Sequence, residues 1–405
     1  MTPADRLYVA RALRDFGDAF VAVLLPVYLS ALDFGPAEIG VIATAALLGS
    51  ALMTIAIGAL GSRHDHRKLL LAASGLMTAT GIAFAALSDF SFILIAAFAG
   101  TLNPSAGTVS VFVPIEHAVL TRSVADVSRT RAFARYSLIG ALAAAAGSLA
   151  AATPELMAQA GLGRLGALKA MFVLYAILGL AGGLVYSGLP RAEVNMPGSR
   201  AGMLGPSRRT VWRLAALFSL DSFAGGFVVQ SLLALWLFDR FGLSLAAAGL
   251  FFFWSGLLSA FSFPVAAWIA QRIGLVNTMV FTHIPASVFL ILAAFAPSLQ
   301  LALACLLVRA ALSQMDVPPR SSYVMAVVTA PERAAAASIT AVPRSLAAAL
   351  SPAVAGAFFS LGLLSWPLVI CGGLKILYDF LLLWAFRHLR PPEEQPAETG
   401  TSASP

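Results

Sequence analysis

Long apolar segments alternate with short polar ones along almost the whole chain of 405 residues. Each apolar segment has about 20 residues or more, the length that an α-helix needs to cross the hydrocarbon core of a bilayer. The pattern predicts twelve membrane-spanning helices, at approximately 7–31, 38–60, 69–87, 91–115, 130–152, 165–189, 211–238, 245–270, 275–296, 299–327, 333–360 and 365–387.

A polar stretch rich in proline, glycine and arginine, residues 191–210, divides the twelve predicted helices into two sets of six. We therefore predict an all-α membrane protein with two pseudo-symmetric six-helix bundles, residues 1–190 and 211–390, joined by a cytoplasmic linker. Residues 391–405 are polar and proline-rich, which predicts a disordered cytoplasmic tail.

Composition supports a membrane protein, because 59% of the residues are hydrophobic and only 11% are charged. The net charge of +7 is spread over short loops and does not form a basic arm or stripe, so nucleic acid is not an expected partner. Lysine and arginine are concentrated in the loops on the side of both termini, and such loops stay in the cytoplasm. We expect an integral protein of the cell (inner) membrane with both termini cytoplasmic.

The two predicted bundles resemble one another in sequence. FGDAF at 16–20 matches FAGGF at 223–227 at an offset of 207, and Arg129 matches Arg333 at an offset of 204. Ordered matches of this kind indicate a duplicated six-helix unit, and parallel repeats are typical of one transporter architecture. The same offsets align Arg14 with Asp221 and Glu116 with Arg320.

The loop GALGSRHDHRKLL at 58–70 resembles the G-x-L-A-D-R-x-G-R-K motif of the major facilitator superfamily. The matching positions are Gly58, Leu60, Arg63, Arg67 and Lys68, with a degenerate echo, WIAQRIG, around Arg272 in the second half. Ser62 occupies the position of the motif's aspartate, which in the family is thought to help lock the inward-closed state, and Asp65 is a candidate substitute. The resemblance covers residues 4–390 and implies a two-bundle fold that transports by alternating access.

Ionisable residues inside the predicted spans are the candidate chemistry, because each costs at least about 2.5–3.5 kcal/mol at mid-bilayer. In the family that the chain resembles, helices one, four, seven and ten line the central cavity. Polar stripes follow these helices here: Arg11, Arg14, Asp15 and Asp18 in the first; Asn103 and Ser110 in the fourth; Asp221 in the seventh; and Arg309, Asp316 and Arg320 in the tenth.

These stripes give the site hypotheses. The predicted cavity and substrate-binding residues are Asp18, Asn103, Ser110, Arg309, Asp316 and Arg344. The predicted proton-coupling residues are Asp221, Asp18 and Glu116. The predicted gating residues are Gly58, Arg63, Asp65, Arg67, Lys68, Arg14, Glu116, Arg320 and Arg272.

Simpler structural alternatives stand beside these hypotheses. Arg14 and Asp221 can form an ion pair that ties the halves together without a part in transport. Glu116 and Arg320 can form a gate between the halves or extend separately to the membrane interface. Lys375 and Asp379, four residues apart, are expected to neutralise each other.

No nucleotide-binding loop, hydrolase motif or metal-ligand set is present, so neither an enzyme nor a cofactor is expected, and HDH at 64–66 is interpreted as solvated. We predict a monomeric secondary transporter that binds a small-molecule substrate and protons within the lipid bilayer. Proton-coupled efflux of small organic molecules is the first interpretation, and uptake of a polar or anionic nutrient is the second. A channel and a sensor that has lost transport are the alternatives of another class.

Overall fold

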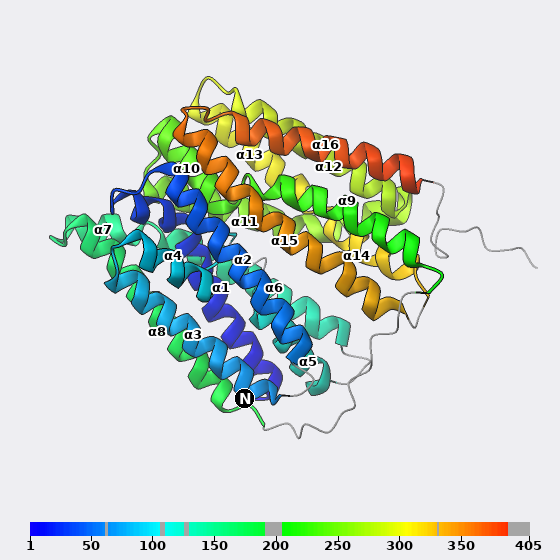
Figure 1. Cartoon of the computed structure of the whole chain (residues 1–405), viewed down its shortest axis with the longest axis horizontal. Helices are drawn as coiled ribbons and strands as arrows, with labels where there is room; N and C mark the ends of the chain where they lie inside the picture. The colour runs from blue at the N-terminus through cyan, green and yellow to red at the C-terminus, as the bar shows by residue number, and fades with distance from the viewer. Residues whose placement is uncertain (61–63, 106–109, 125–128, 191–204, 330–331, 388–405) are drawn as a thin grey trace, which may run out of the picture.

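The computed structural model describes residues 1–60, 64–105, 110–124, 129–190, 205–329 and 332–387. Over these ranges the chain forms sixteen α-helices and no strand (Figure 1). Ten spans are long and apolar enough to cross a membrane. The charged first helix and an interrupted fourth span complete the twelve that hydropathy predicts, so the all-α prediction is confirmed.

The chain divides into two halves that lie side by side in Figure 1, the first running from blue to green and the second from green to red. The helices of the first half are α1 (Pro3–Ser30), α2 (Pro36–Leu60), α3 (His66–Ala86), α4 (Phe90–Ala99), α5 (Phe112–Ser123), α6 (Arg129–Ala150), α7 (Thr153–Gln159) and α8 (Arg164–Ser187). Those of the second half are α9 (Arg208–Gly226), α10 (Gln230–Phe241), α11 (Leu245–Ile273), α12 (Leu275–Ala294), α13 (Leu299–Ser313), α14 (Val317–Ala326), α15 (Arg333–Ser360) and α16 (Trp366–Phe386).

Spans four, seven and ten are broken, whereas the sequence analysis predicts continuous helices there. The fourth breaks between α4 and α5, where the Asn103 side chain accepts a hydrogen bond from the Ser105 N–H, a local turn that competes with helix. The tenth breaks before Pro318 and Pro319, which lack the N–H that a helix interior requires. The seventh breaks directly after Gly226. The second parts of these three spans are the separate helices α5, α10 and α14.

The two ends of the molecule differ. We call the end where α1 begins the basal end and the end where α1 turns into α2 the distal end. At the basal end, the Tyr8 hydroxyl donates to the Ala132 carbonyl and the Arg6 guanidinium donates to the Val185 carbonyl, so α6 and α8 lie beside the start of α1. All three contacting helices belong to the first half.

The halves are joined near the distal end, where α15 packs on α2, α11 on α6 and α10 on α1. A Cβ added to Gly40 would lie 2.5 Å from the Pro352 carbonyl oxygen, and one added to Gly356 would lie 2.5 Å from that of Pro36. Glycine at both positions therefore permits a backbone-to-backbone contact that no other residue would allow.

Hydrogen bonds reinforce this distal seam. The Ala353 N–H donates to Thr44 Oγ1 at 2.9 Å, and the Leu245 N–H donates to Glu155 Oε1 at 2.7 Å. By contrast, α5 packs on α1, α2, α3 and α6, and α14 packs on α11, α12 and α15. The structure is thus closed at its distal end, and the basal segments α5 and α14 pack within their own halves.

Candidate functional site

Glu116 is the centre of a buried polar cluster in the first half. The side chain of Glu116, on α5, is fully buried, and its Oε2 lies 2.8 Å from Arg14 Nη1 on α1. The hydroxyls of Tyr136 and Tyr186 also donate to its carboxylate, each at 2.5 Å. One cation and two hydroxyls therefore hold α5 against α1, α6 and α8.

Two aspartates on the same face of α1 have different partners. Asp15 lies 2.7 Å from Arg11 Nε and 3.5 Å from Arg14 Nε, so it shares two cations. Asp18 is 1% exposed and accepts a hydrogen bond from the Tyr175 hydroxyl at 3.0 Å. Within the described part of the chain no lysine or arginine lies within ion-pair distance of Asp18, in contrast to the other buried carboxylates of this half, Asp15 and Glu116.

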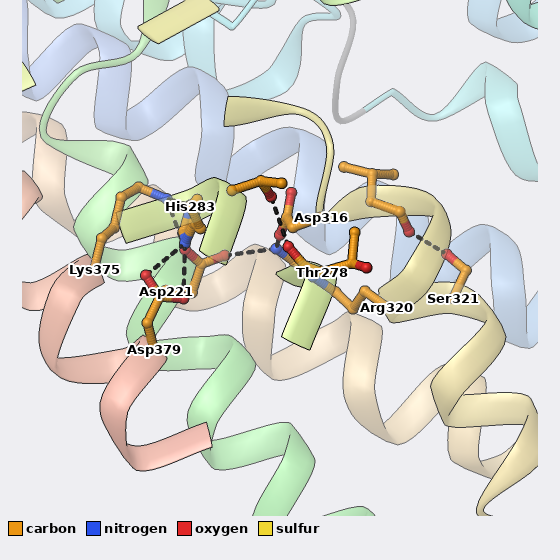
Figure 2. Close-up of polar contacts among 10 residues, drawn as sticks. Asp221, Thr278, His283, Asp316, Arg320, Ser321, Lys375 and Asp379 are labelled. Atoms are coloured by element: carbon orange, nitrogen blue, oxygen red, sulfur yellow. Dashed lines mark hydrogen bonds and ion pairs between the residues drawn. The ribbon is translucent and has the colours of Figure 1, made fainter. Parts of the chain in front are cut away.

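Asp221 is the centre of the corresponding cluster in the second half (Figure 2). From α9, its carboxylate lies 2.6 Å from Lys375 Nζ on α16 and 3.0 Å from Arg320 Nη2 on α14. Arg320 also pairs with Asp316, one helical turn before it. The two charges of Arg320 and Asp221 hold α14 against α9.

His283 extends the cluster between α12 and α16. Its Nδ1 lies 3.1 Å from an Asp379 oxygen and its Nε2 lies 3.3 Å from Lys375 Nζ. Because an ammonium group can only donate, Nε2 accepts and the proton of the neutral ring sits on Nδ1, from which it is donated to Asp379. The contacts thus assign one neutral tautomer to His283.

The two central ion pairs occupy equivalent positions of the sequence repeat with their charges exchanged. Arg14 on the first helix of one half aligns with Asp221 on the first helix of the other, and Glu116 aligns with Arg320. In each half the aligned residues pair with one another, at 2.8 Å and 3.0 Å. The same geometric link is therefore made twice, with opposite polarity.

This pairing corrects three expectations. The structure does not form the Arg14–Asp221 pair, because each residue has a closer partner within its own half. The Glu116–Arg320 contact is absent for the same reason, so no such gate is closed in this conformation. Lys375 and Asp379 do not neutralise each other, since Lys375 binds Asp221 and Asp379 binds His283.

The remaining predicted cavity residues are dispersed. Asn103 is buried in the break of the fourth span, and Ser110 accepts a hydrogen bond from the Phe112 N–H at 3.4 Å. Arg309, on α13, is half-buried and Arg344, on α15, is exposed, and neither forms an ion pair with a described residue. Asp316 belongs to the Asp221 cluster.

The loop residues have simpler places. Gly58 lies in α2, and Arg63 falls outside the described residues, as do the tail at 391–405 and most of the linker. Asp65 is the N-cap of α3, where it accepts a hydrogen bond from the Arg67 N–H at 3.0 Å, and Lys68 follows in the first turn. Arg272 stacks over the Trp268 ring at 4.1 Å at the end of α11.

Sequence reasoning missed part of both clusters. His283 and the three tyrosines at 136, 175 and 186 were not predicted as partners of buried carboxylates. The only signal in the sequence was a polar group within an apolar span, which every such tyrosine or histidine shares. In the described ranges, no group of three or more histidine, cysteine, aspartate or glutamate side chains could hold a metal ion.

Comparison with known proteins identifies the fold. A model of the major facilitator superfamily matches residues 7–220 and again residues 214–405, which together are nearly the whole chain. The chain belongs to the major facilitator superfamily. The two successive matches fall on the two halves that the structure shows, and they agree with an integral membrane transporter that works by alternating access, not with an enzyme.

Several individual proteins are similar to this chain. A Saccharomyces cerevisiae protein described as uncharacterized membrane protein YJR124C is 22% identical over 399 residues, which cover 90% of this chain and 89% of that protein. A bacterial homologue of the lysosomal transporter Spinster, solved inward-facing, has a TM-score of 0.74 at 16% identity and covers 96% of this chain and 98% of its own. The nucleoside transporter NupG has a TM-score of 0.72 at 16% identity, covering 96% and 100%. At such identities these structures establish the shared fold alone.

Proposed function

We propose that this superfamily member couples substrate movement to protons and that Asp18 takes up the proton. The observation that carries the proposal is a mid-span carboxylate, almost fully buried, with a hydroxyl donor and no cation within ion-pair distance among the described residues. An ionisable residue within a span needs a partner, water or a function, and Asp18 has a hydrogen-bond partner but no charged partner among the described residues.

The other candidate carriers are less suitable. Protonation of Glu116 would leave Arg14 with a weakened pair, and protonation of Asp221 would leave Arg320 and Lys375 buried beside a neutral group. Each protonation therefore forfeits the attraction of a buried ion pair, which is costly within the membrane. Asp18 can gain and lose a proton without breaking an ion pair.

The surroundings of Asp18 offer a way to accommodate the proton. The charged groups that interact with it electrostatically are Asp15, Arg14 and Arg11 on α1, and Tyr175 donates a hydrogen bond to it from α8. The Tyr175 hydroxyl also lies 3.4 Å from the Thr101 carbonyl oxygen. Once protonated, Asp18 can donate to Tyr175, whose hydroxyl then donates to Thr101 at the break of the fourth span.

We propose the export of small organic molecules as the direction of transport, with the basal end in the cytoplasm of an inner-membrane monomer. The supporting features are the lysine and arginine of the basal loops and the family resemblance of the loop at 58–70. Uptake of an anionic nutrient is the second candidate, because Arg309 and Arg344 have no ion-pair partner among the described residues.

A pH jump tests proton binding without a known substrate. Proteoliposomes adsorbed on a solid-supported membrane are expected to give a transient current when the pH is stepped between 8 and 6, because protonation of Asp18 moves charge into the membrane. The Asp18→Asn variant should lose this current. Asp239→Asn, which removes an exposed carboxylate at the end of α10, is the matched control and should keep it. A full current in Asp18→Asn would exclude Asp18 as the carrier.

Direction and carrier character need a second measurement. Compounds that stabilise the purified protein against heat are added to vesicles with an imposed pH gradient. Movement of the compound against the direction of proton flow supports export, and movement with it supports uptake. Counterflow, in which unlabelled compound on one side drives labelled compound uphill from the other, distinguishes a carrier from a channel.

A further inference from the structure

Arg344 is an arginine that is both deep in a span and exposed. It lies 11 residues after the start of α15, about 16 Å along the helix axis. Its side chain forms no hydrogen bond or ion pair with a described residue. An arginine at this depth is costly if it faces lipid, so the direction of its side chain decides whether it can bind a ligand inside the protein.

The face of α15 that carries Arg344 points toward the first helix of the same half. Arg344, Ala348, Ser351 and Ala355 follow the spacing i, i+4, i+7 and i+11, which places them on one stripe. Along this stripe Ala348 abuts Gly226, and the Ser351 hydroxyl donates to the Phe223 carbonyl, both on α9.

The apolar side chains that α15 exposes lie elsewhere on the helix. Leu350 and Val354 are 54% and 41% exposed, and they stand about 100° around the helix from Arg344. The lipid-facing side of α15 is therefore not the side of Arg344.

The sequence repeat gives an independent check of this direction. Gly147 on α6 lies against the Phe16 carbonyl of α1, and Ser351 on α15 contacts the Phe223 carbonyl of α9. The two contacts are equivalent, because the repeat offset of 207 relates Phe16 to Phe223 and the offset of 204 relates Gly147 to Ser351. At the same offset Gly140 is the equivalent of Arg344. A Cβ on Gly140 would lie 2.5 Å from an Asp15 oxygen on α1. Position 344 accordingly faces the polar stripe of its own bundle.

No carboxylate is left for Arg344. Asp221 is paired with Lys375 and Arg320, and Asp316 is paired with Arg320. Two further donors near Arg344 also lack acceptors: the buried Nε of Arg320 and the buried hydroxyl of Tyr378 have no hydrogen-bond partner among the described residues. Arg344 interacts electrostatically with both residues and with Asp221, which is itself paired with two other cations.

We propose that Arg344 binds the acidic group of the transported substrate, and hence that the substrate is an organic anion. The inference rests on the proposed transport function and gives it a substrate class. A guanidinium presents a planar set of donors that matches a carboxylate in two-point contact. Exposure on the inner side of α15 makes the group accessible to a solute, and the two unpaired donors beside it favour an acceptor-rich ligand.

The charges of the two halves complement each other in this proposal. The first half has an unneutralised carboxylate, Asp18, and the second half has an unneutralised guanidinium, Arg344. Binding of a proton neutralises the first group, and binding of a monovalent anion neutralises the second. In export against proton flow the two ligands bind in turn, and each lowers the uncompensated charge that the transporter carries in the membrane.

The test uses matched pairs of acids and amides. Full-length protein in nanodiscs is heated with benzoate, salicylate, nicotinate or lactate, and separately with the corresponding primary amide, at constant ionic strength. We expect at least one acid to stabilise the wild type while its amide does not. Arg344→Gln should weaken the apparent affinity for that acid by about 10- to 100-fold. Arg344→Lys should retain part of it.

The control is Arg213→Gln, which removes an exposed arginine near the start of α9 and should bind the acid as the wild type does. Equal stabilisation by acids and amides, an unchanged affinity in Arg344→Gln, or no stabilisation by any acid would each overturn the anion site. Proton binding is measured separately, by pH jump without organic acid. A pH-jump current without acid binding refutes the anion site alone, and acid binding without a current refutes proton coupling alone.

Discussion

The two halves of this protein solve one structural problem with opposite charges. In the first half, Arg14 on α1 binds Glu116 on α5, and in the second half Asp221 on α9 binds Arg320 on α14. Each pair fastens the basal segment of a broken span to the first helix of the same half. The link survives an exchange of sign, which shows that its geometry matters more than which helix carries the cation.

The halves differ in what completes each pair. Tyrosine hydroxyls surround Glu116, whereas Asp221 is completed by Lys375, and His283 and Asp379 extend that cluster. The tyrosine hydroxyls add no charge to the cluster of Glu116, whereas Lys375 and Asp379 add charges to the cluster of Asp221. The difference teaches that Glu116 has one cationic partner, Arg14, whereas Asp221 has two, Arg320 and Lys375.

Each half also has one charged residue for which the other has glycine. FGDAF aligns with FAGGF, so Asp18 corresponds to Gly225, and the offset of 204 makes Gly140 the equivalent of Arg344. A Cβ on Gly225 would meet only Lys375 Nζ, at 3.9 Å. The two residues that we propose to bind the proton and the anion thus have no charged counterpart at the equivalent position of the other half.

The largest expected effect comes from removing the single carboxylate of the first cluster. Glu116→Ala leaves two tyrosine hydroxyls buried without their acceptor and leaves Arg14 with only the more distant Asp15, at 3.5 Å, so we expect a loss of about 3–5 kcal/mol in the free energy of unfolding. Unfolding in mixed micelles with increasing sodium dodecyl sulfate measures the loss. The double variant Arg14→Gln, Glu116→Gln should recover most of it, because no buried charge then remains unpaired.

The equivalent change in the second half sharpens the comparison. Asp221→Ala should cost about 1–3 kcal/mol, because Arg320 keeps Asp316 and Lys375 keeps His283. A loss as large as that of Glu116→Ala would contradict the redundancy inferred for this cluster.

A smaller effect is expected at the seam between the halves, which tests whether each half moves as one body. In Gly40→Ala the new methyl would lie 2.5 Å from the Pro352 carbonyl oxygen and 2.9 Å from the Gly356 Cα. Overpacking of this kind costs about 1–3 kcal/mol, so the closed distal end should become less populated. Spin labels at Ser30→Cys and Leu361→Cys should report a longer distance.

Gly75→Ala is the control for that experiment, because a Cβ at Gly75 has nothing within 4 Å. An unchanged distance distribution in Gly40→Ala would show that the seam yields locally and that the halves are not separate rigid bodies.

The smallest effect lies outside the membrane spans, in a carboxylate of the second half. Hydrogen bonds from Ser207, Thr329 and the Gly205 N–H lower the pKa of Glu332 from its ordinary value of 4.5 to about 2. Its contribution to stability is therefore complete above about pH 4.5 and is lost as the pH falls toward 2. The free energy of unfolding should decline more over this interval in the wild type than in Glu332→Gln. Parallel curves would disprove the contribution.

Hydropathy and the repeat were sufficient to predict the fold. Apolar segments of bilayer length determine the number of spans, and a duplicated sequence fixes which positions are equivalent. The broken spans were missed although Asn103-Pro104 and Pro318-Pro319 signal them, because a window of about 20 residues averages over a gap of a few residues.

The pairing of charges could not be predicted in the same way. Lys375 and Asp379 have the spacing of an ideal helical pair, yet each binds a residue on another helix. The choice depends on the rotation and depth of neighbouring helices, which spacing along one helix does not contain. Alignment of the two halves correctly identified Arg14 and Asp221 as equivalent positions. The expectation that they pair with one another was wrong, because each pairs within its own half.

The separate neutralisation of each half has a consequence for how the protein is made. Every ion pair among the described residues is complete within one half. During synthesis, the first six spans can bury their arginines beside their own acids before the ribosome reaches the second six. The first half can therefore insert into the membrane without an unpaired charge that needs a counter-ion from the second half.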